Sequence, residues 1–452
     1  MTGKGCSESP ETVHYLNGIH IHKGVRHMDD YKPRIVDEIL RKKLSGKGAV
    51  LIEGPKWCGK TTTAEQAAKS ILYMNEPKKL KQNLMLAETD PEVLLKGDKP
   101  RLIDEWQLAP KLWDTIRFSV DHERKFGLYI LTGSAVPPET DEIHHTGTGR
   151  FSRLRMRPMS LYESGESSGE VSLDELFKNP GVSIRGTSGL GLEDVFFLIC
   201  RGGWPMAIGL EESISLMQAN DYYDAVVNED ISRVDGVKRD PGYTKRLMHS
   251  YARNQGSQAT LDTISGDLNE NEGADPCNKT LSSYIKALKK IFVIEDMEAW
   301  NPNLRSKTAI RTSDTRYFVD SSIAAASLGI GPKDLLEDLE TAGLLFETMA
   351  IRDLRVYADA LDAKVFHYRD KTNLECDAVI HRRNGSYGLI EIKLGGDRLI
   401  EEGSASLRKL ADKIDTDKMK APSFMMILTA VGDYAYKRTD GVYIVPIACL
   451  KP

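Results

Sequence analysis

The stretch Gly54-Pro55-Lys56-Trp57-Cys58-Gly59-Lys60-Thr61 decides the fold of this chain. It has the form G-x-x-x-x-G-K-T, follows the apolar residues 49–52 and precedes a helical stretch at residues 62–74. Glycines at both ends free the backbone to wrap its amides around a phosphate, and a helix starting at the end of the loop would direct its dipole there. A mere glycine-rich turn would leave Lys60 and Thr61 unexplained. The sequence therefore predicts a phosphate loop that binds a nucleotide.

The residue types in this loop predict particular contacts with ATP. Lys60 should reach the β- and γ-phosphates, and the Thr61 hydroxyl should ligate Mg²⁺. Cys58 is predicted to be a small loop residue rather than a reactive thiol. The predicted ATP-binding set in this stretch is Gly54, Pro55, Lys56, Trp57, Cys58, Gly59, Lys60, Thr61 and Thr62.

Two further strands should complete the nucleotide site. Residues 100–106 read Pro-Arg-Leu-Ile-Asp-Glu-Trp. Asp104 would end a strand and hold Mg²⁺ through water, and Glu105 would polarise the attacking water. The alternative is that both carboxylates cap the next helix. Residues 127–134 form a third apolar strand, at whose end Thr132 or Ser134 would sense the γ-phosphate.

Four arginines lie close together in residues 148–160. In an extended strand Arg153, Arg155 and Arg157 would share one face. One arginine could meet the γ-phosphate of its own nucleotide or of a neighbouring subunit's nucleotide. Arg150, in a glycine-rich turn, is the first candidate for this role and Arg153 the second. The alternative is a solvated basic strand face.

Composition sets limits on the class of protein. A chain of 452 residues predicts two or three domains, and 40% hydrophobic with 28% charged residues is ordinary for a globular protein. The net charge of −5 means that any contact with nucleic acid must come from a local basic patch. Six scattered cysteines without a C-x-x-C pair argue against a zinc ribbon or a disulfide framework. With no apolar run of membrane-spanning length, we expect a cytoplasmic protein without membrane contact.

Acidic residues and a lysine converge on a predicted hairpin near the C-terminus. Asp377 lies on one strand, and Glu391 and Lys393 share one face of the next. Such charges on an apolar hairpin are costly unless compensated, so Mg²⁺ or Mn²⁺ would compensate the carboxylates. Lys393 would orient or deprotonate a water, or stabilise a transition state, and Glu347 from a preceding helix could complete the metal ligands. The alternative is a surface salt bridge between Glu391 and Lys393.

The middle of the chain changes character several times. Residues 164–191, rich in Ser, Gly and Glu, predict an elongated surface insert, and residues 192–240 predict a helical lid. Residues 242–317 read as two helices followed by two strand-like runs, the pattern of a winged helix. Such a module binds DNA or docks proteins. Its cations could meet DNA phosphates: Lys279, Lys286, Lys289, Lys290, Arg305 and Lys307.

Several motifs together resemble prokaryotic AAA-type ATP-binding proteins with a C-terminal PD-(D/E)XK nuclease-like domain of unknown function. The motifs are GPKWCGKTTTA at 54–64, RLIDEWQ at 101–107, LTGSA at 131–135, GRFSRLRMRPMSLYES at 149–164, RGGWP at 201–205, RYFVDSSIAA at 316–325, LLFETMAIRDL at 344–354, ECDAVI at 375–380 and LIEIK at 389–393. The resemblance implies that Pro205 packs near the adenine. It also implies that Glu347, Asp377, Glu391 and Lys393 are the residues of a nuclease-like metal site.

The expected fold is therefore α/β, in five parts. They are an N-terminal extension (1–30), a P-loop AAA-type ATPase core with a parallel sheet (31–165), an insert and helical lid (166–241), a winged helix (242–317) and a restriction-endonuclease-like α/β domain (318–452). The expected function is Mg²⁺-dependent ATP binding and hydrolysis that controls a DNA-directed, nuclease-like C-terminal domain. The alternative is a signalling switch ATPase that changes oligomeric state with its nucleotide and uses a catalytically silent C-terminal fold for protein docking.

Overall fold

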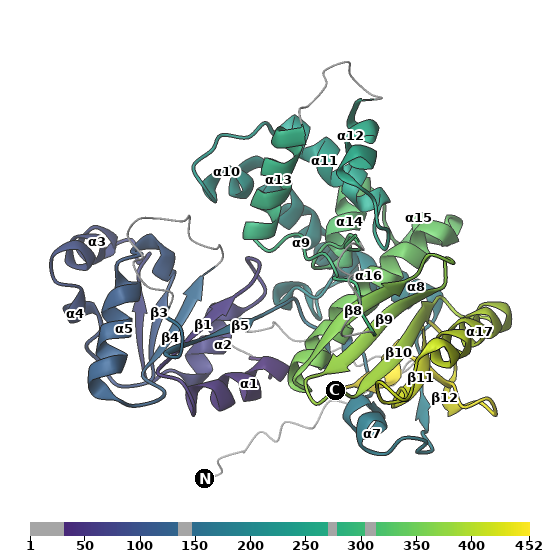
Figure 1. Ribbon diagram of the computed structural model, residues 1–452. Coiled ribbons are helices and arrows are strands. Elements are labelled where there is room, and N and C mark those ends of the chain that lie inside the picture. Colours follow the sequence, from purple (N-terminus) through teal and green to yellow (C-terminus); the bar gives the residue numbers. More distant parts are fainter. Residues whose placement is uncertain (1–30, 134–146, 270–277, 303–312) are drawn as a thin grey trace, which may run out of the picture. The chain divides into compact units, whose positions relative to one another are not determined.

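The computed structural model describes residues 31–133, 147–269, 278–302 and 313–452 (Figure 1). Within it, Lys32–Pro452 pack as one unit. Ser134, Arg305 and Lys307, which the sequence nominated for ligand contacts, lie outside the described residues, as does the predicted extension at residues 1–30. No helix of the described ranges combines the length and the apolar character needed to cross a membrane.

The first part of the fold is a parallel five-stranded sheet in the order β2-β3-β4-β1-β5. Its elements are α1 (Ile35–Leu44), β1 (Ala49–Glu53), α2 (Lys60–Ala67), β2 (Ser70–Tyr73), α3 (Leu80–Thr89), α4 (Pro91–Leu94), β3 (Arg101–Asp104), a 3-10 turn (Trp106–Leu108), α5 (Leu112–Glu123), β4 (Tyr129–Gly133) and β5 (Phe151–Arg155). The alternation of strands and helices predicted this parallel sheet, and the structure confirms it.

Both faces of this sheet are covered, which explains its continuous apolar strands. The period of two in β1 sends Ala49 and Leu51 into a core shared with α5. Val50 and Ile52 enter a second core shared with α1 and α2. Every residue of β1 and β4 is therefore buried, as is typical of parallel strands between two helical layers.

A mostly helical region follows. It contains α6 (Leu161–Ser164), β6 (Val171–Ser172), α7 (Leu173–Lys178), β7 (Gly186–Thr187), α8 (Leu192–Arg201), a 3-10 turn (Pro205–Ala207), α9 (Glu212–Ala225), a π-helical turn (Val226–Asp230), α10 (Ile231–Arg233), α11 (Pro241–Arg253), α12 (Leu261–Asn269), α13 (Asn278–Lys290), α14 (Ser321–Leu328) and α15 (Pro332–Glu337). After α13, antiparallel bridges join Ile294 to Phe318 and Met297 to Thr315. The two strand-like runs expected at residues 291–294 and 316–319 therefore do lie side by side.

The prediction of a surface insert at residues 164–191 was wrong. β6 pairs with the final strand, and β7 pairs with β12 of the C-terminal sheet. Val171, Leu173 and Leu176 are fully buried in the largest core. The Ser- and Gly-rich composition hid these apolar positions, and their strand partners lie far downstream in the chain.

The last third forms a mixed seven-stranded sheet in the order β7-β12-β13-β11-β10-β9-β8. Its elements are α16 (Leu339–Ala360), β8 (Ala363–Arg369), β9 (Glu375–Arg382), β10 (Tyr387–Lys393), α17 (Asp397–Lys413), β11 (Phe424–Thr429), β12 (Tyr434–Lys437), β13 (Tyr443–Pro446), a 3-10 turn (Ile447–Cys449) and β14 (Leu450–Lys451), which lies outside this sheet. Ile390 and Ile392 pack on the side of α16, whereas Leu389 packs on the side of α17.

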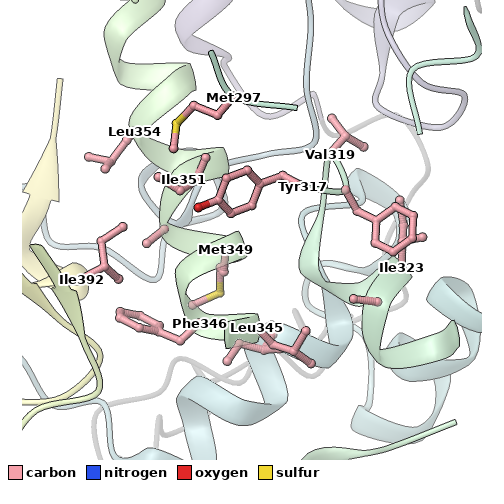
Figure 2. Close-up of a cluster of buried hydrophobic side chains, with 14 of the residues drawn as sticks. Met297, Tyr317, Val319, Ile323, Leu345, Phe346, Met349, Ile351, Leu354 and Ile392 are labelled. Carbon is pink, nitrogen blue, oxygen red and sulfur yellow. The ribbon is translucent and has the colours of Figure 1, made fainter. Parts of the chain in front are cut away.

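Helix α16 is a central element of the largest core. Figure 2 shows its apolar side chains Leu345, Phe346, Met349, Ile351 and Leu354 between Ile392 on one side and Tyr317 and Val319 on the other. Most of its length is buried. Any residue that α16 carries is therefore held firmly between the C-terminal sheet and the helical region.

Candidate functional site

The phosphate loop lies at the carboxyl end of β1, and α2 begins at Lys60. A Cβ on Gly54 would approach the Met156 carbonyl oxygen to 2.1 Å, so no side chain fits at this position. Gly59 has a φ of +94°, in the left-handed region that favours glycine. Both glycines are therefore required by the local geometry.

The polar residues predicted around the loop come together. Lys60 is buried, and its Nζ donates to the Pro55 carbonyl oxygen at 2.6 Å. The Thr61 hydroxyl donates to Asp104 Oδ1 at 2.7 Å, and the Thr132 hydroxyl donates to the same oxygen at 2.6 Å. The ends of β3 and β4 thus meet the first turn of α2. A hydroxyl and a carboxylate so close together can hold Mg²⁺, directly or through water.

Glu105 follows β3 in an unusual backbone conformation. Its φ of +55° lies in the left-handed region, which is strained for a residue with a side chain and is common at active sites. Its carboxylate accepts a hydrogen bond from Gln107 Nε2 and makes no helix-capping bond, contrary to the capping alternative. Burial, opposed by the hydrogen bond from Gln107, raises the pKa of Glu105. A carboxylate with a raised pKa is a stronger base toward water.

The middle of the loop contacts the helical region. Lys56 Nζ lies 2.6 Å from Asp230 Oδ1, in the π-helical turn, and the Trp57 ring lies 5.7 Å from the ring of Tyr222 on α9. Pro205 Cγ lies 3.5 Å from the position that a Cβ on Gly59 would take. The segment predicted to lie near the adenine is therefore adjacent to the phosphate loop. Single-turn π-helices often mark functional sites.

Arg150 does not lie near the phosphate loop of its own chain. Its carbonyl accepts from Ala49 N at the start of β1, whereas the loop follows the end of this strand. A strand of this length separates the two by about 15 Å. The Arg150 side chain is paired with Asp121 at 2.7 Å. The hypothesis that Arg150 meets its own nucleotide was wrong, and action on a neighbouring subunit's nucleotide stays a prediction.

The other arginines in and after β5 are each paired with a carboxylate. Arg153 pairs with Glu53 at the end of β1, so it lies closer to the loop than Arg150 does. Arg155 lies 3.6 Å from Glu295, and Arg157 pairs with Glu295 and with Asp359 on α16. The alternative of a solvated basic face was therefore wrong for Arg157, whose side chain is only 10% exposed, whereas Arg153 and Arg155 keep exposed side chains. Arg157 connects the ATPase sheet to later elements.

Arg34 is a contact residue that sequence reasoning missed. Its buried guanidinium donates to the Cys58 carbonyl oxygen of the phosphate loop at 2.9 Å, and to the Arg157 carbonyl oxygen at 2.9 Å. It also pairs with Glu163 at 3.0 Å. These partners lie 24, 123 and 129 residues from Arg34 in the chain, and an arginine before a helix carries no local signal for them. Asp230 was missed for the same reason.

The C-terminal carboxylates and lysine also come together, on β9, β10 and α16. Lys393 Nζ lies 3.0 Å from Asp377 Oδ2 and 2.6 Å from Glu391 Oε2. Asp377 Oδ2 accepts the Ile392 N–H at 2.7 Å, beyond the last ladder pair of β9 and β10. Glu391 is only 4% exposed, so the alternative was right about the ion pair and wrong about its surface location. Glu347 is half-buried and accepts from the Tyr317 hydroxyl.

This cluster has more carboxyl groups than cations. Burial and the neighbouring Asp377 raise the pKa of Glu347 well above its usual range. The same two causes, opposed by Lys393, raise the pKa of Glu391. Glu347 and Glu391 therefore tend to retain protons at neutral pH unless another cation joins them.

The donor set fits a divalent cation chemically, although it is not arranged as a metal centre. Glu391 Oε1 is buried without a hydrogen-bond partner, and so is Thr429 Oγ1 on the neighbouring β11, where Thr429 pairs with Lys393. Across the described ranges, no three His, Cys, Asp or Glu side chains are grouped as ligands of one metal ion. In this cluster the Lys393 ammonium takes the place between Asp377 and Glu391 that such an ion would need.

Comparisons with known families divide the chain into three matched stretches. The AAA domain matches residues 46–165. Two families described as domains of unknown function, DUF8612 and DUF4143, match residues 192–334 and 342–450. The AAA match covers the sheet that carries the phosphate loop. The DUF4143 match covers the C-terminal cluster.

Two curated relatives and one solved structure resemble the chain. Uncharacterized protein Rv2008c of Mycobacterium tuberculosis and uncharacterized protein Mb2031c of Mycobacterium bovis are each 22% identical over 357 residues, which is 78% of this chain and 72% of the relative. The Walker-type ATPase PABY2304 of Pyrococcus abyssi is 12% identical, with a TM-score of 0.40 over 64% of this chain and 94% of that chain. The AAA match, together with the parallel sheet and its phosphate loop, supports an ATP-binding, AAA-type phosphate-loop ATPase.

Proposed function

We propose that this protein is a Mg²⁺-dependent ATPase whose nucleotide state controls a DNA-directed C-terminal domain with a nuclease-like site. The observation that carries the proposal is the buried contact of Lys393 with both Asp377 and Glu391, in the same chain as a complete phosphate loop. The ion pairs are not needed to stabilise the fold, because a buried ion pair seldom contributes more to the free energy of unfolding than well-packed apolar residues in its place.

In the ATPase half, each nearby side chain has a proposed role. Lys60 would move from the Pro55 carbonyl to the β- and γ-phosphates. Thr61 and Asp104 would hold Mg²⁺, which neutralises the charge that develops during phosphoryl transfer. Glu105 would remove a proton from the attacking water. Thr132, already bonded to Asp104, would sense the γ-phosphate through that carboxylate.

In the C-terminal half, Asp377, Glu391 and Glu347 would hold Mg²⁺ or Mn²⁺. A bound divalent ion there would supply Lewis-acid stabilisation for the hydrolysis of a phosphodiester. Lys393 would be released from the two carboxylates and orient the attacking water. Glu391 Oε1, which has no hydrogen-bond donor among the described residues, is the oxygen that we expect to accept a cation first.

A buried network supports control of one half by the other. Gly203 N donates to Asp320 at 3.0 Å, and Asp320 pairs with Arg352 at 2.8 Å. Arg352 also pairs with Asp353, which accepts the Leu161 N–H at 2.9 Å. Gly203 belongs to the segment of Pro205, which lies next to the phosphate loop, and Leu161 follows β5 in the chain. Arg352 lies on α16 together with Glu347. A shift at the nucleotide therefore has a rigid route to the C-terminal cluster.

The proposed DNA contact is on α13. Lys279, Lys286 and Lys290 line a hollow of about 650 Å³, together with two serines and the carboxylate of Asp235. Lys289, which does not line the hollow, pairs with Asp296. Three lysines against one carboxylate, spaced along one helix face, suit a phosphate backbone. Replacing Lys286 and Lys290 with Gln should weaken DNA binding, whereas Lys333→Gln on α15 should not.

The decisive experiment is DNA cleavage. Plasmid and linear DNA are incubated with Mg²⁺ or Mn²⁺, with and without ATP, using the wild type and Lys393→Ala. Cleavage that needs Lys393 and responds to ATP supports the proposal. Cleavage that survives in Lys393→Ala contradicts the assigned site.

A second candidate is a switch ATPase whose C-terminal fold docks a protein and does no chemistry. It is favoured by the ion pairs of Lys393, which leave the carboxylates neutralised without a metal. The contact of Pro205 with the phosphate loop also suits a switch. This candidate predicts ATP hydrolysis without cleavage under any condition, and a change of oligomeric state between ADP and ATP, measurable by analytical ultracentrifugation.

A further inference from the structure

Arg34 makes an unusual set of contacts around the phosphate loop. Its side chain is 4% exposed, and each of its three nitrogens has a protein partner. Glu163 is fixed by the Arg34 Nε and Ile35 N on one oxygen and by Ser160 N and Oγ on the other. The guanidinium is therefore locked in place before it meets the loop.

The bond from Arg34 to the Cys58 carbonyl determines the direction of the next N–H. In a trans peptide, the carbonyl of one residue and the N–H of the following residue point in opposite directions. Holding the Cys58 carbonyl toward Arg34 therefore turns the Gly59 N–H away from it. Over the described ranges no protein acceptor is recorded for this N–H. It is thus left free at the end of the loop, where α2 begins and an anion is favoured.

We infer that Arg34 is a positioning residue for the nucleotide: its guanidinium fixes the Cys58–Gly59 peptide so that the Gly59 N–H is presented to a phosphate. Arg34 itself touches backbone and carboxylate and no part of the nucleotide. The inference rests on nucleotide binding by the loop and not on the proposed control of DNA. Lysine cannot replace this side chain, because a single ammonium cannot reach three separate acceptors with the geometry of a planar fork.

The first test compares Arg34→Lys with Arg316→Lys in the full chain. Arg316 is a matched control, because it also pairs with a carboxylate, Asp296, and donates to a carbonyl, Ala259, but makes no contact with the loop. Binding of Mg-ADP and of adenosine is measured by calorimetry. We expect Arg34→Lys to weaken Mg-ADP on the order of tenfold and to leave adenosine unchanged. Equal Mg-ADP affinity in Arg34→Lys and the wild type, or an equal loss in Arg316→Lys, would overturn the inference.

The second test separates positioning from stability. Arg34→Ala is titrated with methylguanidinium at concentrations well below those that unfold proteins, and both Mg-ADP affinity and the thermal midpoint are followed. Recovery of affinity in Arg34→Ala, with no effect of methylguanidinium on the affinity of Arg316→Ala, supports positioning. Recovery of the midpoint alone would mean a purely structural role. Lys60→Ala is run alongside: if it binds Mg-ADP normally, the loop is not the nucleotide site, and the failure belongs to the proposed function instead.

Discussion

The two candidate sites each place a lysine near carboxylates at the end of a strand, but they balance its charge differently. Lys60 donates to a carbonyl, and Asp104 accepts from two hydroxyls. Lys393 is bonded to both Asp377 and Glu391. An ammonium held by a carbonyl transfers to a phosphate at little cost, whereas one that must leave two buried carboxylates does not. The nucleotide site is thus prepared for an anion, and the C-terminal site is neutralised within itself until a cation enters.

The largest effect should come from removing the lysine that is free to meet an anion. Lys60→Ala should abolish ATP hydrolysis and weaken ATP by roughly a hundredfold or more, because the β- and γ-phosphates lose their main charged partner. Steady-state turnover and calorimetric binding measure the two effects. The thermal midpoint without nucleotide should change little, since Lys60 bonds only a loop carbonyl. Intact turnover in this variant would mean that Lys60 does not bind the phosphates of ATP, and the comparison of the two lysines would fail.

The carboxylates of the nucleotide site should separate into two roles. Glu105→Gln should lower turnover by roughly 10²–10³-fold while ATP stays bound, because the base is lost and the metal contact is kept. Asp104→Asn should instead weaken Mg-ATP, because the carboxylate that meets Thr61 is lost. Filter binding and single-turnover hydrolysis distinguish the two. An equal loss of binding in both variants would contradict the assigned roles.

In the C-terminal site, removal of the lysine should lower the free energy of unfolding, whether or not the site catalyses a reaction. Lys393→Met leaves Asp377 and Glu391 without their shared partner, at a cost of about 3 kcal/mol in the free energy of unfolding. Mn²⁺ should restore part of this loss by binding the released carboxylates. Urea unfolding with and without Mn²⁺ measures both effects, with Lys333→Met as a control. A loss that Mn²⁺ does not change would mean that the cluster binds no cation and would favour the docking candidate.

The sequence predicted those parts of the two sites that short motifs encode. The loop, the Thr61–Asp104 contact and the hairpin with Asp377, Glu391 and Lys393 follow from residue spacing within a strand or turn. Arg34, Asp230 and the pairing of residues 171–187 with the last strands could not be predicted, because their partners are distant in the chain and no local pattern marks them. Arg150 was misplaced because it precedes a strand, and in a parallel sheet the residues before the strands lie at the edge opposite to the ligand.

The smallest effect should be a pH dependence confined to the C-terminal site. The pKa of both Glu347 and Glu391 is raised to about 8 in the folded chain, mainly by burial and by Asp377, from an ordinary value near 4.5. The folded state then holds protons that the unfolded state releases. The contribution of these two groups to the free energy of unfolding should be complete below about pH 4.5. It should be lost as the pH rises through about 8.

Urea unfolding in a chelator should show this fall as a progressive loss of unfolding free energy between pH 5 and pH 8. Glu391→Gln should reduce the slope, because its amide cannot titrate, and Glu391→Gln combined with Glu347→Gln should remove most of it. Glu105→Gln at the nucleotide site should leave most of the slope in place. Divalent cations should bind more tightly as the pH rises over the same interval, since they compete with the same protons. A full slope that survives in the double variant Glu347→Gln/Glu391→Gln would place the titration elsewhere in the chain. The difference between the C-terminal site, where the lysine is bound to carboxylates, and the nucleotide site, where the lysine is bound to a carbonyl, would then need another explanation.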